Sequence, residues 1–196
     1  MSLTDEQAQD LARMRTAAQQ REWTTLQDTF KRLIAELDPL IALSVVAPRV
    51  QAFVPRFRHY YPEAGWVEQL MLTVVSYASA PRDLPVTAIN QFPSPGCGNF
   101  IMAVLDLART VQEGHTVFER FSHVTNAAAN AILADLQYTY FKNRPEVYAQ
   151  LHDENLPEAE RQQIQYHFWL NEIVSKRDTA LWLNLADGVE AALERQ

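Results

Sequence analysis

The sequence predicts an all-α protein, a single-domain multi-helix bundle of roughly seven to nine helices. Three observations support this prediction. Apolar residues recur with the 3.6-residue period of a helix along almost the whole chain. Glycine is scarce, with five residues among 196, and no Asn-Gly or Asp-Gly hairpin signal occurs. The composition, 47% hydrophobic and 21% charged, is that of a globular protein whose length suits one core. We therefore expect residues 1–196 to form one domain.

The first part of the chain predicts two helices. Thr4, with Gln7 three residues later, has the pattern of a capping box, so a helix is expected from there to about Gln20. A second helix is expected after Trp23, because its apolar residues fall on one face. These residues are Leu26, Phe30, Leu33, Ile34 and Leu37. The Asp-Pro step at 38–39 ends this helix, because a residue before proline disfavours the α conformation.

A buried central helix is predicted for residues 40–54, which are apolar nearly all round. Pro48 and Pro55 are expected to kink or divide it, because proline removes a backbone donor. Another helix is expected over about 63–78. Residues 81–98 contain four prolines and a Gly-Cys-Gly step, which predict an irregular but ordered loop across the bundle.

The second half of the chain predicts helices whose ends have recognisable signals. Gly114 suits the position after a helix, and Pro157 suits the first position of one. Asp178 or Thr179 is expected to cap the last helix, because short polar side chains accept hydrogen bonds from first-turn amides. The helices are expected at about 99–113, 117–142, 145–151, 157–176 and 179–194.

Charge and cysteine content limit the kinds of partner and compartment. The net charge is −7, so phosphate backbones and anionic membranes are repelled unless a local basic patch overrides it. Cys97 is the sole cysteine, so no intrachain disulfide forms. The longest apolar stretch, Leu40–Ala47, is far short of the roughly 20 residues that span a bilayer. The N-terminus lacks the pattern of a secretory signal. We expect a soluble cytoplasmic protein without a membrane partner.

A metal site is the first candidate for chemistry. His115, Glu119 and His123 are spaced i, i+4 and i+8, and imidazole with carboxylate suits iron or zinc. Two residues of another predicted helix extend this set, His167 and Glu172. The competing interpretation, which we favour, is a capping box between Thr116 and Glu119. In that case His115 lies outside the helix and the metal triad is lost.

A ligand pocket is the second candidate. One side of the helix at 117–142 is polar but carries no lysine or arginine, and its residues are Ser122, His123, Asn126, Asn130 and Gln137. His123, Asn126 and Asn130 are the proposed ligand-binding residues of this stripe. The alternative is an ordinary solvent-facing side of an alanine-rich helix.

Cys97 is a candidate reactive thiol. It precedes a predicted helix, where free amides and the helix dipole stabilise a thiolate. The alternative, which is commoner, is a buried cysteine in a tight glycine turn.

Two groups of residues are candidates for partner binding. Arg49, Arg56 and Arg58 alternate with aromatic residues, a combination that binds phosphates, carboxylates or stacked bases. The alternative is a helix end whose arginines extend to solvent while the aromatics pack inward. Trp169 follows Phe168 directly, so the two side chains point to different sides of a helix. Either one is an exposed anchor for a partner, or helices pack on both sides.

The sequence favours a function without catalysis. It contains no phosphate-binding glycine-rich loop, no Gly-x-Ser-x-Gly elbow, no His-Glu-x-x-His motif and no Cys-x-x-Cys pair. We expect a helical adaptor or regulatory module that binds another protein, for which a second copy of the chain is one candidate. The alternative is a ligand-binding protein or enzyme with a His/Asn/Glu-lined pocket for a metal or haem. A nucleic-acid regulator using the three arginines is disfavoured by the acidic charge. The sequence identifies no cofactor.

Overall fold

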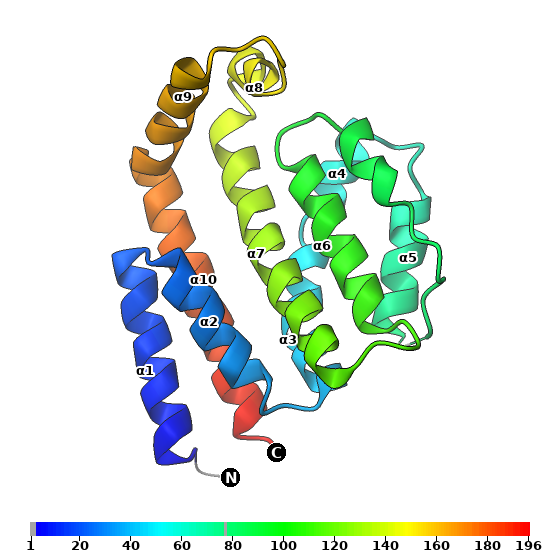
Figure 1. Ribbon diagram of the computed structural model, residues 1–196, viewed down its shortest axis with the longest axis vertical. Helices are drawn as coiled ribbons and strands as arrows, with labels where there is room; N and C mark the ends of the chain where they lie inside the picture. Colours follow the sequence, from blue (N-terminus) through cyan, green and yellow to red (C-terminus); the bar gives the residue numbers. More distant parts are fainter. Residues whose placement is uncertain (1–2, 77) are drawn as a thin grey trace.

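The computed structural model describes residues 3–76 and 78–196, and the side chains of all of these except 88–90. Within these residues it contains ten α-helices, one 3₁₀ helix and no strand, which confirms the predicted fold class (Figure 1). The helices are α1 (Asp5–Gln20), α2 (Trp23–Ile34), α3 (Pro39–Gln51), α4 (Val54–Tyr60), α5 (Trp66–Val75), η1 (Val86–Gln91), α6 (Cys97–Thr110), α7 (Val117–Phe141), α8 (Pro145–Leu151), α9 (Glu158–Leu170) and α10 (Glu172–Leu193). The count is one above the expected range because the proline-rich central segment divides into two helices.

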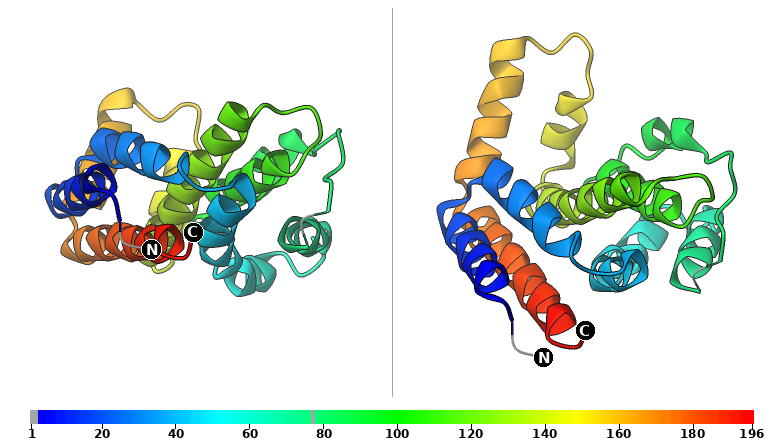
Figure 2. Two further views of the ribbon diagram at one scale, coloured as in Figure 1. Left: turned by 90° about the horizontal axis from the view of Figure 1, so that it is seen from below. Right: turned by 60° about the horizontal axis from the view of Figure 1, so that its bottom comes forward.

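The long helix α7 lies at the centre of the molecule. The helices α1, α2 and α10 cover one side of it, and α3 to α6 cover the other (Figures 1 and 2). The helix α9 continues beyond the ends of α1 and α2, away from the body of the bundle, and connects back to α7 through α8 (Figure 2). The start of α1 and the end of α10 lie near each other at the opposite end of the molecule (Figure 1).

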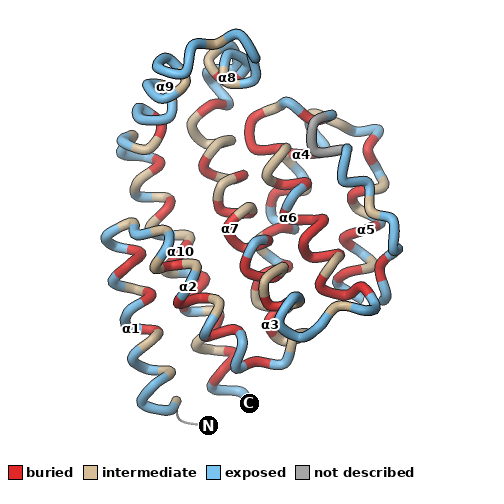
Figure 3. The backbone as a smooth tube through the Cα atoms, viewed as in Figure 1, coloured by how far each residue is buried: buried red, intermediate tan, exposed pale blue. Residues whose placement is uncertain are grey.

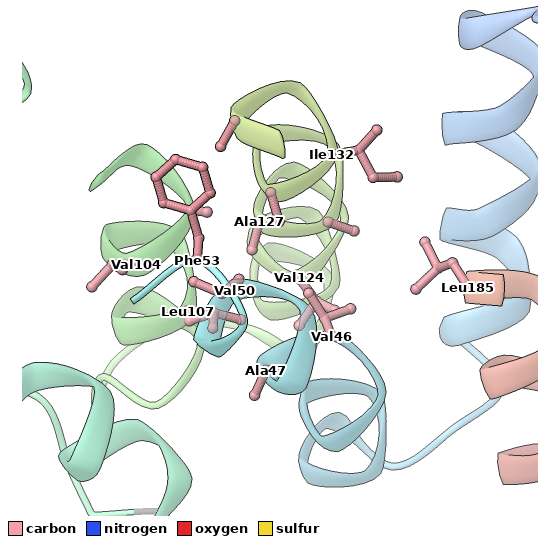
Figure 4. Packing of buried hydrophobic residues seen from close by; sticks show 14 of the residues in the cluster. Val46, Ala47, Val50, Phe53, Val104, Leu107, Val124, Ala127, Ile132 and Leu185 are labelled. Atoms are coloured by element: carbon pink, nitrogen blue, oxygen red, sulfur yellow. The ribbon is translucent and has the colours of Figure 1, made fainter. Parts of the chain in front are cut away.

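A continuous cluster of buried apolar residues connects α1 to α10, and it lines the inner faces of the helices (Figure 3). Alanines make up five of the eleven buried residues of α7, and their small side chains allow neighbouring helices to approach closely. Figure 4 shows Val46 and Val50 of α3 beside Val124 and Ala127 of α7. In Figure 3, α9 is mostly exposed, and Phe168 is its one residue in the buried class.

The predicted central helix is the pair α3 and α4. Pro48 lies inside α3, Pro55 lies in the first turn of α4, and the two helices are bent by 40°. A narrow stripe of α3, including Ser44 and Pro48, reaches solvent, while the remaining faces pack against α5, α6, α7 and α10. Among the described residues, no single helix is long and apolar enough to cross a membrane. The bent α3–α4 pair meets the length and composition criteria when its two helices are taken together.

The break between the last two helices is at Asn171, so the predicted break at Asp178 or Thr179 is wrong. The Asn171 side chain accepts hydrogen bonds from the amides of Ile173 and Val174, at 3.1 and 3.3 Å, and therefore caps α10. Asp178 is fully buried within α10, where its carboxylate accepts bonds from Arg21 and Trp23. From the sequence alone, Asp178 could be either a helix cap or a buried carboxylate within a helix. Only the packing of α1 and α2 against α10 shows that it is the latter.

Candidate functional site

The turn between α6 and α7 contains the residues of the predicted metal site. The Thr116 side chain accepts a bond from the Glu119 amide at 3.3 Å, and the Glu119 carboxylate accepts one from the Thr116 amide at 2.7 Å. The capping interpretation is therefore confirmed. The hydrogen bonds from Thr116 also hold the pKa of Glu119 below its usual value.

The same turn brings two of the predicted ligands together without forming a metal centre. The rings of His115 and His123 are 5.1 Å apart, edge to face, and His115 Nδ1 is 3.8 Å from the Glu119 carboxylate. No group of three or more His, Cys, Asp or Glu side chains in the described part of the chain is arranged to hold a metal ion. His167 and Glu172 lie instead at the α9–α10 junction, where Glu172 pairs with Lys176. The predicted metal site is thus wrong, because Glu119 is committed to the helix cap.

Asp106, which the sequence analysis did not single out, is the main partner of His123. Its Oδ1 lies 3.3 Å from His123 Nδ1 and 2.9 Å from Arg109 Nη1. Burial raises the pKa of Asp106 despite these partners, and burial also lowers the pKa of His123. A carboxylate behind an imidazole can orient a proton acceptor. His123 is only partly exposed, however, and it does not line the large cleft described below.

The predicted ligand-binding stripe does not form one pocket. Asn126 is exposed, while Asn130 accepts a hydrogen bond from the Asn99 side chain of α6 at 3.1 Å. His123 bonds to Asp106. The three side chains therefore face different neighbours, and the prediction that they line a common pocket is wrong. Helix period placed them on one side of α7, but α6 covers part of that side.

Cys97 is completely buried at the first position of α6. Burial raises the pKa of its thiol to about 12, so the thiolate that a nucleophile requires is disfavoured. The structure therefore favours the alternative interpretation, a buried cysteine in a tight glycine turn. Gly96 adopts a positive φ of 79° just before it, and a Cβ at this position would collide with the Ala134 carbonyl of α7.

The arginines of the predicted partner site are engaged within the molecule. Arg56 pairs with Asp135 of α7 at 2.5 Å and packs over the rings of Phe53 and Tyr138. Arg58 forms a two-pronged pair with Glu68 of α5. Burial lowers the pKa of Arg49. Arg56 and Arg58 thus each have a carboxylate partner within the molecule, which favours the alternative interpretation of an ordinary helix end over a partner-binding cluster.

Trp169 is half-buried and packs against other helices, which argues against its being the exposed anchor. Its ring lies edge to face with Trp23 at 5.6 Å and under the Arg21 guanidinium at 5.7 Å. Phe168 stacks on Phe141 at 5.6 Å. Helices therefore pack on both sides of α9 near its end, which was the alternative interpretation.

Three large apolar residues close to Trp169 in sequence are exposed at the end of α9 and the start of α10. Tyr166, Leu170 and Ile173 are 62, 61 and 65% exposed, and we call them the elbow patch because they lie where α9 meets α10. The i, i+4 spacing of Tyr166 and Leu170 was visible in the sequence. Which face of the helix is inward depended on the packing of Phe168 and Trp169, which the sequence does not specify.

A large polar cleft lies between α6, α7 and the α8–α9 connection, with a volume of about 690 Å³. We call it the polar cleft. Its lining residues are Phe92, Pro93, Gly98, Asn99, Met102, Gln137, Tyr148, Leu151, His152, Glu154, Arg161 and Gln165. The sequence placed Gln137 on the polar side of α7 but could not bring α8 and α9 beside it, because these contacts join segments far apart in the chain.

Comparison with known proteins gives no relative from which a function could be transferred. No family model matches the chain, no curated protein is significantly similar in sequence, and no solved structure is significantly similar to the fold.

Proposed function

We propose that the protein is a helical adaptor that binds another protein through the elbow patch. The observation that carries the proposal is the exposure of three large apolar side chains, Tyr166, Leu170 and Ile173, at one junction of two helices. Tyr166 and Leu170 lie one turn apart on α9, Ile173 lies in the first turn of α10, and large exposed apolar side chains close together in a fold commonly mark a binding site. Phe168 and Trp169 anchor the junction in the core, so the patch is held on a packed support.

The shape of this region favours a partner with an apolar groove. The helix α9 stands away from the bundle, and apolar side chains one turn apart on a helix, such as Tyr166 and Leu170, are the kind of anchors that insert into the groove of a partner. Each large side chain has at most about 250 Å² of surface, so three that are two-thirds exposed supply less than roughly 500 Å². A stable dimer needs about 800 Å² from each subunit. The patch thus suits a transient complex better than a stable pair of identical chains.

The charges of the molecule support a protein partner over a nucleic acid. The net charge is −7, and two of the three clustered arginines, Arg56 and Arg58, are paired with Asp135 and Glu68. A cytoplasmic location belongs to the same proposal.

The experiment is photo-crosslinking in the native lysate, with a photoreactive residue at 170 and, for comparison, at the exposed position 163. We expect one predominant crosslinked partner from position 170 only. Leu170→Asp and Ile173→Asp should abolish capture without changing the circular dichroism spectrum, because both side chains are exposed. Leu72→Asp is the matched control, since Leu72 is 65% exposed on α5. Equal loss in the control, or no loss in the elbow variants, would contradict the proposal.

Light scattering on the purified protein tests whether a second copy of the chain, rather than another protein, binds at the elbow patch. A monomer is the expected result. A dimer that Leu170→Asp dissociates would instead identify a second copy of the chain as the partner at this patch.

A further inference from the structure

The polar cleft is a separate feature from the elbow patch, and its size is that of a small-molecule site. Its volume of about 690 Å³ lies within the range of ordinary ligand pockets. Its walls come from four helices and from the segment that precedes α6, so the side chains around it are held by different parts of the fold.

One buried side-chain acceptor in the wall of the cleft has no partner among the residues that the structure describes. The amide oxygen of Gln137 is buried and accepts no hydrogen bond from the described residues. An unpaired buried acceptor lowers the stability of a protein, and such costs are tolerated mainly where a ligand or water completes the bonding. The last torsion of a glutamine side chain is broad, so a small rotation can present the amide to the cleft.

The wall carries paired donors and acceptors with no excess of either charge. Three amide side chains line it, those of Asn99, Gln137 and Gln165. Amides contribute both a donor and an acceptor. Burial and the nearby Arg161 lower the pKa of His152, so its imidazole is neutral near pH 7 and also offers one of each.

The two charged side chains of the wall are opposite in sign. Arg161 is fixed by hydrogen bonds to the carbonyls of Leu151 and Asp153, and Glu154 supplies the negative charge. A net anion or cation therefore gains little from the cleft as a whole. Hydroxyl groups match such a wall best, because each one donates and accepts through the same atom.

We propose that the polar cleft binds a small, uncharged, hydroxyl-rich molecule of the size of a monosaccharide or disaccharide, which bonds to the amides of Asn99, Gln137 and Gln165. The inference is independent of the elbow patch.

The experiment uses the side-chain amide signals of the uniformly ¹⁵N-labelled protein. Titration with D-glucose, sorbitol and trehalose should shift the amide peaks of Asn99, Gln137 and Gln165 along one saturating curve for at least one of the three. The peak of Gln163, which is exposed on α9 outside the cleft, should not move. Absence of a saturating shift with all three compounds would overturn the proposal. So would an equal shift at Gln163, or saturation of the cleft peaks by inorganic phosphate alone.

Gln137→Leu separates a ligand-binding role from a structural one. The substitution removes the unpaired buried oxygen and roughly preserves volume, so the urea midpoint should stay the same or rise. Binding of the compound identified by titration should weaken about tenfold. A lower midpoint with unchanged binding would show that Gln137 is structural and would refute the proposal.

Two further variants complete the test. Gln165→Ala lies at an exposed position of α9, so it leaves folding intact and should also weaken binding. Gln163→Leu is the matched control and should change neither the midpoint nor the binding. Unchanged binding in Gln165→Ala would count against the proposal even if Gln137→Leu failed to fold.

Discussion

Two aspartates packed between the helices of this molecule have pKa values shifted in opposite directions. Asp106 of α6 is buried beside Arg109 and His123, and burial raises its pKa. Burial alone would also raise the pKa of Asp135 of α7. Hydrogen bonds from Arg177 and Arg56 outweigh that effect and hold the pKa below its usual value.

The difference lies in the partners and in where they come from. Asp135 is bonded by two guanidinium groups, Arg56 from α4 and Arg177 from α10, so it joins three helices that are distant in sequence. Asp106 has one guanidinium, from Arg109 three residues along its own helix, and one imidazole, that of His123, whose pKa burial lowers. A buried carboxylate thus remains charged where two permanent cations converge on it, and it tends toward the neutral form where only one does.

The largest expected effect comes from removing the charge of Asp135. Asp135→Asn leaves Arg56 and Arg177 without an anion in a half-buried site, so the free energy of unfolding should fall by about 2–3 kcal/mol. Urea denaturation measures this change. Glu68→Gln removes the partner of Arg58 at an exposed pair and should alter the midpoint little. If Asp135→Asn lowered the free energy of unfolding no more than Glu68→Gln, the pairing of Asp135 with two arginines would add no stability beyond that of an exposed ion pair.

The same substitution at Asp106 should have a smaller and opposite effect. Asp106→Asn keeps an acceptor oxygen for Arg109 and His123 while it removes a charge that burial disfavours. At neutral pH the free energy of unfolding should stay the same or rise by up to about 1 kcal/mol. If Asp106→Asn lowered the free energy of unfolding as much as Asp135→Asn does, the ionised form of Asp106 would be stabilised as strongly as that of Asp135, contrary to this prediction.

The smallest effect is expected in the pH dependence of stability. Burial lowers the pKa of His123 in the folded protein, so below about pH 6.5 the unfolded chain binds a proton more readily. The stability due to neutral His123 is therefore present above that pH and is lost as the pH falls through the folded pKa. His152 contributes in the same direction.

Urea midpoints between about pH 7.5 and about pH 5 test this prediction. His123→Gln should flatten the decline, whereas His59→Gln, at an exposed position of α4, should follow the wild-type profile. A decline as steep in His123→Gln as in the wild type would show that the Asp106–His123 pair does not couple protonation to folding.

The limits of sequence analysis are clearest in α7 and the α9–α10 segment. The capping box at Thr116 and the length of α7 were predictable, because both depend on residues within a few positions of each other. The break at Asn171 was not, because Asp178 has the same local preference and differs only in being buried against Arg21 and Trp23. The candidate sites failed for the same reason. Cys97, Arg56 and Trp169 have the right chemistry for function, but neighbouring helices bury or pair them.

The sequence by itself determined the helical class of this protein, the ends of most helices and the acidic surface charge, because these follow from periodicity, capping and composition. The tertiary structure alone decided which polar side chains are buried, which carboxylates remain charged, and where the elbow patch and the polar cleft lie. Each of these depends on contacts between segments far apart in the chain. Asp135 with Arg56 and Arg177, and the wall that Gln137 shares with Arg161, are examples. Local preference carries no information about such contacts, because it is set by neighbours in sequence rather than in space.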